Sequence, residues 1–146
     1  MLTHPTKQVI PFAPASFTNA ATASGNIDRQ GFDFMSLDVT MSTSNAVTNN
    51  PSVLKLSESD DTVVTNFVDI AAAVGDGVGG FTIPNAVTEG TWGVKLNVDL
   101  RGRKRYLKLS ASPVTTQVIA AVANLSAGDE APAAAGSAGV NALVEL

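Results

Sequence analysis

Positive charge gathers at one point of the chain, and this cluster is the first candidate for chemistry. The chain has a formal net charge of −4, yet five of its nine basic residues fall between positions 101 and 108. Arginine suits the binding of carboxylates because its planar guanidinium group forms two parallel hydrogen bonds with them. The cluster therefore predicts either a docking site for an acidic partner or a solvated turn, and its members are Arg101, Arg103, Lys104, Arg105 and Lys108.

The other residues capable of chemistry form no recognisable site. The single histidine, His4, lies near the start of the chain, which is a poor scaffold for a catalytic relay or a zinc site. Glu58, Asp60 and Asp61 lack the spacing of a calcium loop. Residues 75–80 match G-x-G-x-x-G, but extended residues follow where a dinucleotide site needs a helix. Because cysteine is also absent, we expect no enzymatic activity, no cofactor and no metal.

Composition also argues against nucleic acid and membranes as partners. A nucleic-acid-binding domain needs a broad basic face, which an acidic chain with one small cluster does not offer. The longest apolar run, residues 118–123, is far shorter than the ~20 residues of a spanning helix. Prolines break up residues 1–16, so these do not form a signal peptide. We expect synthesis in the cytoplasm.

Hydrophobic residues alternate with a period of two along much of the chain, which indicates half-buried β-strands. Many short strands separated by turns predict an all-β fold, an antiparallel β-sandwich of the jelly-roll type. We assign residues 27–146 to a single sandwich domain. The expected strands are 35–41, 53–57, 63–70, 81–84, 92–100, 106–111, 117–125 and 140–146.

Residues 1–26 are expected to form an extended N-terminal arm, because three prolines forbid a helix there. Two alternatives remain for residues 8–12. They form a first strand of their own domain, or they lie on a neighbouring subunit. In either case four apolar side chains need a surface to cover them, and they are candidate partner-binding residues: Val9, Ile10, Phe12 and Phe17.

The strands at 92–100 and 106–111 are close enough in sequence to form a hairpin. A four-residue loop at 101–104 would keep apolar residues on one face of both strands, because it pairs Val98 with Leu107. This register places the candidate partner-binding cations at the tip of the hairpin, with Arg105 just below Arg101, Arg103 and Lys104.

Five segments of the chain recur, in this order, in small proteins of tailed bacteriophages and prophages. The Arg-Gly-Arg-Lys-Arg-Tyr block at 101–106 is the most specific of them. Together they cover nearly the whole chain, which resembles the virion structural proteins that decorate phage capsids, also called cement proteins. The segments are residues 9–14, 27–33, 56–61, 99–108 and 125–132.

The resemblance implies a non-enzymatic protein of the virion that binds the outer surface of the head. Its partners would be the major capsid protein and sister subunits, as a trimer that bridges neighbouring capsomers. Repetition on a lattice strengthens such modest contacts through multivalency. Two alternatives stay open: a structural protein of the phage tail or of head completion, and a virion-borne module that binds carbohydrate or the cell surface.

Overall fold

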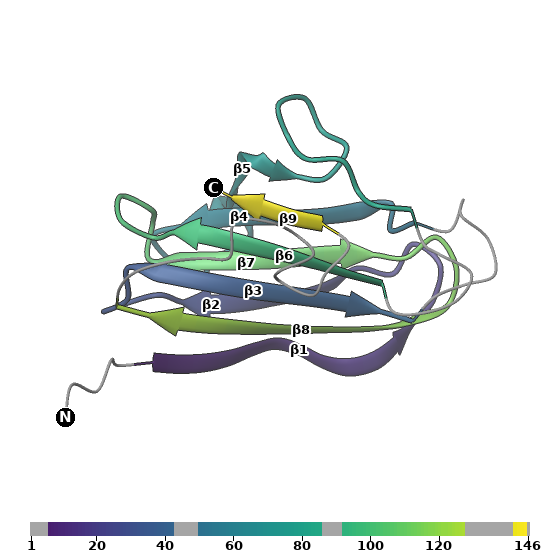
Figure 1. The fold of residues 1–146 in the computed structure, drawn as a ribbon, viewed down its shortest axis with the longest axis horizontal. Coiled ribbons are helices and arrows are strands. Elements are labelled where there is room, and N and C mark those ends of the chain that lie inside the picture. Colours follow the sequence, from purple (N-terminus) through teal and green to yellow (C-terminus); the bar gives the residue numbers. More distant parts are fainter. Residues whose placement is uncertain (1–5, 43–49, 86–91, 128–141, 146) are drawn as a thin grey trace.

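A computed structural model describes residues 6–42, 50–85, 92–127 and 142–145. Within these residues the chain is almost entirely β-structure, arranged as two facing sheets (Figure 1). One sheet has the order β1-β8-β3-β6-β9 and the other the order β2-β7-β4-β5. The strands are β1 (Thr6–Phe17), β2 (Ala23–Asp28), β3 (Phe34–Met41), β4 (Val53–Ser59), β5 (Val68–Val74), β6 (Trp92–Asp99), β7 (Tyr106–Ser112), β8 (Gln117–Ser126) and β9 (Ala142–Glu145).

The strand pairing is that of a jelly roll. Antiparallel pairs are nested, so that β1 lies beside β8, β2 beside β7, β3 beside β6 and β4 beside β5. Folding this nested ladder over itself produces the two sheets. β9 adds a parallel strand at the free edge of β6. The predicted all-β sandwich is therefore confirmed.

The core lies between the sheets and is built by alternation along each strand. In β3 the buried residues are Met35, Leu37, Val39 and Met41, while the residues between them are partly or fully exposed. Trp92 begins β6 with 1% of its surface exposed, and its Nε1 donates a hydrogen bond to the carbonyl oxygen of Pro84 at 2.9 Å. Alternation places one apolar face of each sheet against the other.

The predicted hairpin between residues 92–100 and 106–111 is wrong. β6 pairs with β3 and β9, whereas β7 pairs with β2 and β4 in the opposite sheet. Both strands bury one apolar face, and that pattern suits two strands facing each other across a core as well as two neighbours in one sheet. The connection at residues 100–105 therefore crosses from sheet to sheet.

The structure also differs from the predicted N-terminal arm. β1 pairs with β8 from Thr6 to Phe17, and Phe12 belongs to the hydrophobic core. Of the two alternatives for residues 8–12, a strand of the same domain is the one present. Register shifts between Val9 and Phe12 and between Phe12 and Ala15 surround the two prolines of the strand, as expected because proline cannot donate to a ladder.

Two short elements deviate from the expected strands. Residues 63–70 contain a 3-10 turn, η1 (Val64–Asn66), before β5 begins at Val68. Residues 81–84 contribute a single bridge between Phe81 and Gly75 in place of a strand. The expected terminal strand at 140–146 corresponds to β9.

Candidate functional site

The basic loop, residues 100–105, carries the predicted cluster at one end of the sandwich. Its turn is fixed by the chain itself, because the amide of Arg103 donates to the carbonyl of Leu100 at 3.0 Å. The amide of Arg101 donates to the Asp99 carboxylate at 3.0 Å. Gly102 occupies the left-handed region with φ of 82°, which favours glycine.

Each of the four candidate cations in this loop faces a carboxylate of its own chain. Arg101 pairs with Asp99 at 2.7 Å, and Arg105 pairs with Asp28 at 2.9 Å. The end of β4 and the turn after it supply the other two partners. Glu58, near the end of β4 itself, lies 3.8 Å from Arg103, and Asp60, in the turn that follows, lies 3.3 Å from Lys104.

Arg29, which directly follows β2, contacts this loop and was not singled out as a candidate from the sequence. Its Nε donates to the carbonyl oxygen of Lys104 at 3.0 Å, and its Nη2 donates to the carbonyl of Arg103. Its backbone amide donates to the carbonyl of Arg105 at 3.1 Å. The side chain of Arg29 thus satisfies carbonyls that the turn leaves unpaired and holds the loop against the end of β2.

The ion pairs shift the titration of two carboxyls. Hydrogen bonds from the Arg101 side chain and amide lower the pKa of Asp99 to about 2. The hydrogen bonds from Arg105 lower the pKa of Asp28, and the same contact raises the pKa of Arg105. Both carboxyls therefore stay ionised at neutral pH and keep the loop cations paired.

The acids that the sequence assigned to a partner thus come from within the chain. Asp28 lies 77 positions from Arg105 in the sequence. Glu58 lies 46 positions from Lys104, and its carboxylate accepts a hydrogen bond from the backbone amide of Lys104 at 3.2 Å. The cluster joins β2, β4 and β7 at one end of the molecule. Its ion pairs fasten the basic loop, which arrives from β6 of the five-stranded sheet, to the end of the four-stranded sheet.

The four apolar candidates on β1 divide into two groups. Val9, Phe12 and Phe17 pack into or against the core, and the rings of Phe12 and Phe17 meet edge to face with centroids 6.3 Å apart. Ile10 points outward and is 57% exposed. Only Ile10 among them is available to a partner as the structure stands.

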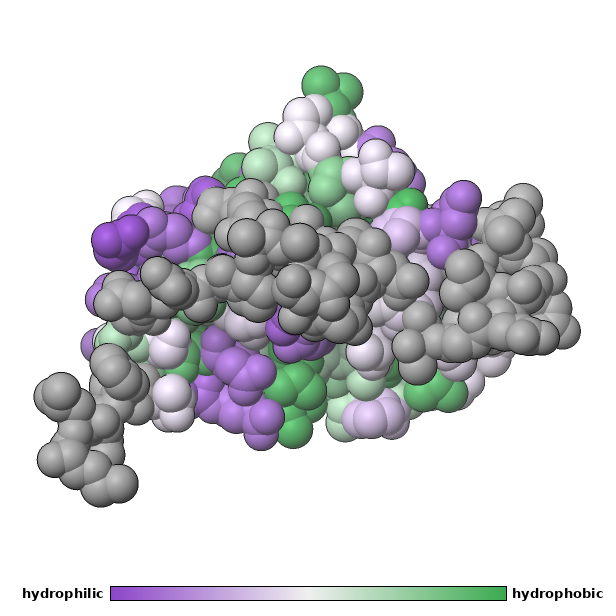
Figure 2. All heavy atoms as spheres, viewed as in Figure 1, coloured by the Kyte–Doolittle hydropathy of each residue, from purple (hydrophilic) through white to green (hydrophobic). Residues whose placement is uncertain are grey.

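Ile10 belongs to an apolar strip on the outer face of the five-stranded sheet. β8 turns alternate residues outward, and three of these in succession are apolar: Val118, Ala120 and Val122. Ile10 lies opposite Val122, because Val9 pairs with Ala123 and Phe12 with Ala121. Figure 2 shows hydrophobic side chains interrupting the more polar surface over β1 and β8. We call this set, with Pro14, the β8 strip.

One end of the β8 strip opens into a shallow, mostly apolar hollow of about 390 Å³. Val118, which is 44% exposed, stands at its rim. On neighbouring β3 three successive outward residues are instead polar, namely Ser36, Asp38 and Thr40. The β8 strip is therefore bordered by polar side chains along this part of β3. The hollow is lined by Pro14, Thr40, Met41, Ser42, Trp92, Val118 and Ala120.

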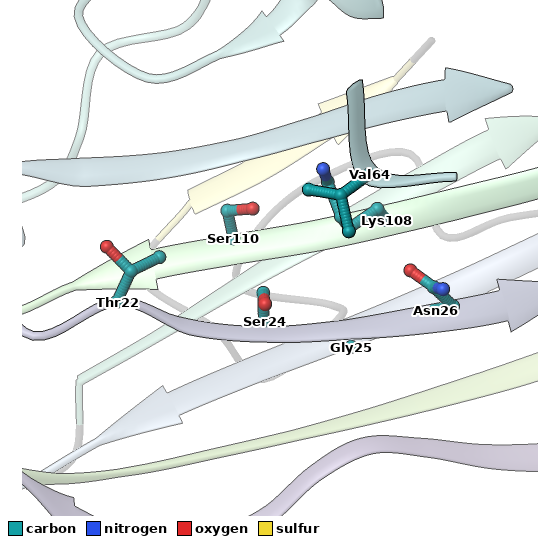
Figure 3. A pocket seen from close by; sticks show the side chains of 7 residues that line it. All are labelled: Thr22, Ser24, Gly25, Asn26, Val64, Lys108 and Ser110. Carbon is teal, nitrogen blue, oxygen red and sulfur yellow. The ribbon is translucent and has the colours of Figure 1, made fainter. Parts of the chain in front are cut away.

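A second, polar groove lies on the outer face of the other sheet. Its floor is formed by β2 and β7, and η1 borders it through Val64 (Figure 3). The volume is about 510 Å³, within the usual range for a small-molecule site. The lining residues are Thr22, Ser24, Gly25, Asn26, Val64, Lys108 and Ser110.

Metal-ligand groups and membrane-spanning helices were two further features to look for in the described part of the chain. There, His, Asp and Glu residues form no group of three that could hold a metal ion. His4 lies outside the described residues. No helix in the described ranges is long and apolar enough to cross a membrane.

Comparison with known proteins gives distant structural matches. No family model and no curated protein matches the chain. It is similar to the crystal structure of the SPBc2 prophage-derived protein YomS, with a TM-score of 0.46 and 14% identity over 87% of this chain and 97% of the other. It is also similar to a chain in the structure of infectious bursal disease virus Gx strain, with a TM-score of 0.45 and 12% identity over 87% of this chain and 33% of the other.

Proposed function

We propose that this chain is a structural protein of a tailed-phage virion that decorates the outer surface of the head. In this role it binds the major capsid protein and sister subunits, as a trimer, and reinforces the joints between capsomers. It performs no enzymatic reaction and binds neither nucleic acid nor a membrane. The resemblance of its sequence segments to capsid decoration proteins motivates this choice.

The β8 strip is the structural observation that carries the proposal. Ile10 and Val118 are large apolar side chains left more than two-fifths exposed on one face of a regular sheet. Covering such a side chain contributes roughly 1.5–3 kcal/mol, so a few of them give a modest contact. On a lattice, modest contacts repeated between neighbours become effective through multivalency.

The basic loop takes a different part in this function from the one that the sequence suggested. Its cations have carboxylate partners within the chain, so an acidic partner would have to compete with those carboxylates for them. We assign the loop to holding the sandwich rigid, and the β8 strip to contact with the capsid or the sister subunit. The Arg-Gly-Arg-Lys-Arg-Tyr block at 101–106, the most specific segment of the resemblance, then serves the fold and not the contact with a partner.

Capsid binding of charged variants tests this assignment. Val118→Asp and Ile10→Asp each place a carboxylate in the β8 strip, and we expect weaker co-sedimentation with undecorated heads. Val78→Asp is the matched control, because Val78 is fully exposed in the loop after β5 and away from the strip. Equal binding by all three variants and the unmodified chain would remove the β8 strip from the interface.

A tail or head-completion protein remains the alternative within the same class. Such a protein is expected to form rings and to bind at a single vertex or along the tail. Labelling of intact virions with an antibody against the chain separates these cases, since decoration distributes the label over the whole head.

A further inference from the structure

The polar groove between β2, β7 and η1 carries a half-buried ammonium group, that of Lys108, with no oxygen partner among the described residues. Every other lysine or arginine in the described residues donates to, or forms an ion pair with, an oxygen of the chain. Lys108 instead lies over the ring of Phe67, with Nζ 4.3 Å from the ring centroid. Its three donors are thus available to an anionic group.

Unpaired neutral polar groups surround this ammonium. Ser24 lies opposite Ser110, and Asn26 lies opposite Lys108, on the adjoining strands β2 and β7. The side chains of Ser24, Asn26 and Ser110 make no hydrogen bond to any other described residue. Ser110 is nevertheless buried, with a relative exposure of 6%. Hydroxyl and amide groups in this spacing can each donate to and accept from a ligand.

An apolar wall completes the groove. Val64 is 73% exposed and overlaps the Lys108 side chain in the view of Figure 3, and Phe67, which follows η1, supplies the ring that the ammonium faces. A ligand that fits this groove has a carboxylate, several hydroxyls and an apolar ring face. Those three features together describe an acidic sugar.

We propose that this groove binds a carboxylate-bearing sugar of the kind found in acidic polysaccharides. Lys108 receives the carboxylate, while Ser24, Asn26 and Ser110 bind the ring hydroxyls. The C–H face of the sugar packs on Val64. This activity is independent of capsid binding, because the groove and the β8 strip lie on opposite outer faces of the sandwich.

A titration of the full chain followed by amide NMR tests the proposal. The probes are a galacturonate trisaccharide, glucuronate and N-acetylneuraminate, with the neutral galactose trisaccharide for comparison. We expect an acidic sugar to shift the amides of Ser24, Asn26 and Lys108, and the neutral one to bind at least tenfold more weakly, as the loss of one charge-assisted hydrogen bond implies.

Two charge-matched variants show whether Lys108 is responsible. Lys108→Gln should weaken binding of the acidic sugar about tenfold or more while the circular dichroism spectrum stays unchanged. Lys104→Gln removes the same charge from the basic loop and should leave binding as it is. Binding by none of the three acidic sugars, or equal loss in both variants, would overturn the proposal. A glutamate-rich peptide that binds the same amides more tightly would also overturn it, since the groove would then recognise protein carboxylates.

Discussion

The guanidinium group of Arg105 meets the carboxylate of Asp28 through two hydrogen bonds, Nε to Oδ1 at 3.2 Å and Nη2 to Oδ2 at 2.9 Å. Asp28 ends β2 and Arg105 directly precedes β7, so the pair closes one end of that ladder. A bidentate contact of this geometry fixes orientation as well as charge. It belongs to the set of pairs that holds the basic loop to its own domain.

Acid should loosen this end of the molecule. The pKa values of Asp28 and Asp99 are lowered in the folded state, the latter to about 2. A depressed carboxyl pKa stabilises the fold above the unfolded value of 3.8 and ceases to do so as the pH falls through the folded value. NMR titration of the side-chain carboxyl carbons should give midpoints below 3.8 for both residues. A midpoint at or above that value would contradict the pairing.

Arg29 should matter more to stability than the exposed arginine of the same loop. Arg29→Ala leaves two carbonyls of the loop without their donor, and we expect a loss of about 1–2 kcal/mol in the free energy of unfolding. Arg101→Ala removes a solvent-exposed ion pair with Asp99 and should stay closer to the unmodified protein. Urea denaturation measures both, and equal effects would show that Arg29 does not hold the loop.

Phe12 and Ile10 provide a test of where β1 lies. Phe12 is 9% exposed within the core, so Phe12→Ala should cost about 3 kcal/mol of unfolding free energy, whereas Ile10→Ala should be nearly neutral. Because β1 packs in its own domain, the loss should not depend on protein concentration. A loss that grows on dilution would place β1 on a neighbouring subunit instead.

Gly25 marks a close approach between β2 and β1. A Cβ atom at this position would lie 1.8 Å from the carbonyl oxygen of Pro11, so the two strands would have to separate. We expect Gly25→Ala to destabilise the fold by about 1–3 kcal/mol. Ser24→Ala is the control, since Ser24 is exposed. Thermal unfolding that gives the same midpoint for both variants would contradict this packing.

The sequence predicted the positions of the strands better than the pairing between them. Alternation identified β3, which buries one face and exposes the other, and β6, whose apolar residues also occupy alternate positions. The same alternation cannot tell a neighbour in a sheet from a strand facing it across the core. For that reason β6 and β7 were expected to form a hairpin.

The sequence alone predicted the cations of the candidate site but not the residues that bind them. The basic residues at 101–105 stand out because they are adjacent in sequence. Asp28, Glu58 and Arg29 reach them only through the jelly-roll topology, over separations that no local pattern reveals. The polar groove likewise joins β2 to β7, and its only sequence signal is polar residues at alternate positions of two distant strands.

The position of this chain in a reconstruction of the intact virion tests the central claim most directly. The virion is the one produced by the genome that encodes the chain. The account predicts jelly-roll density on the outside of the head at the joints between capsomers, with β1 and β8 turned toward a neighbouring subunit or the shell. Density confined to the tail or to a single vertex, or a head contact made by the basic loop with the β8 strip left in solvent, would contradict it.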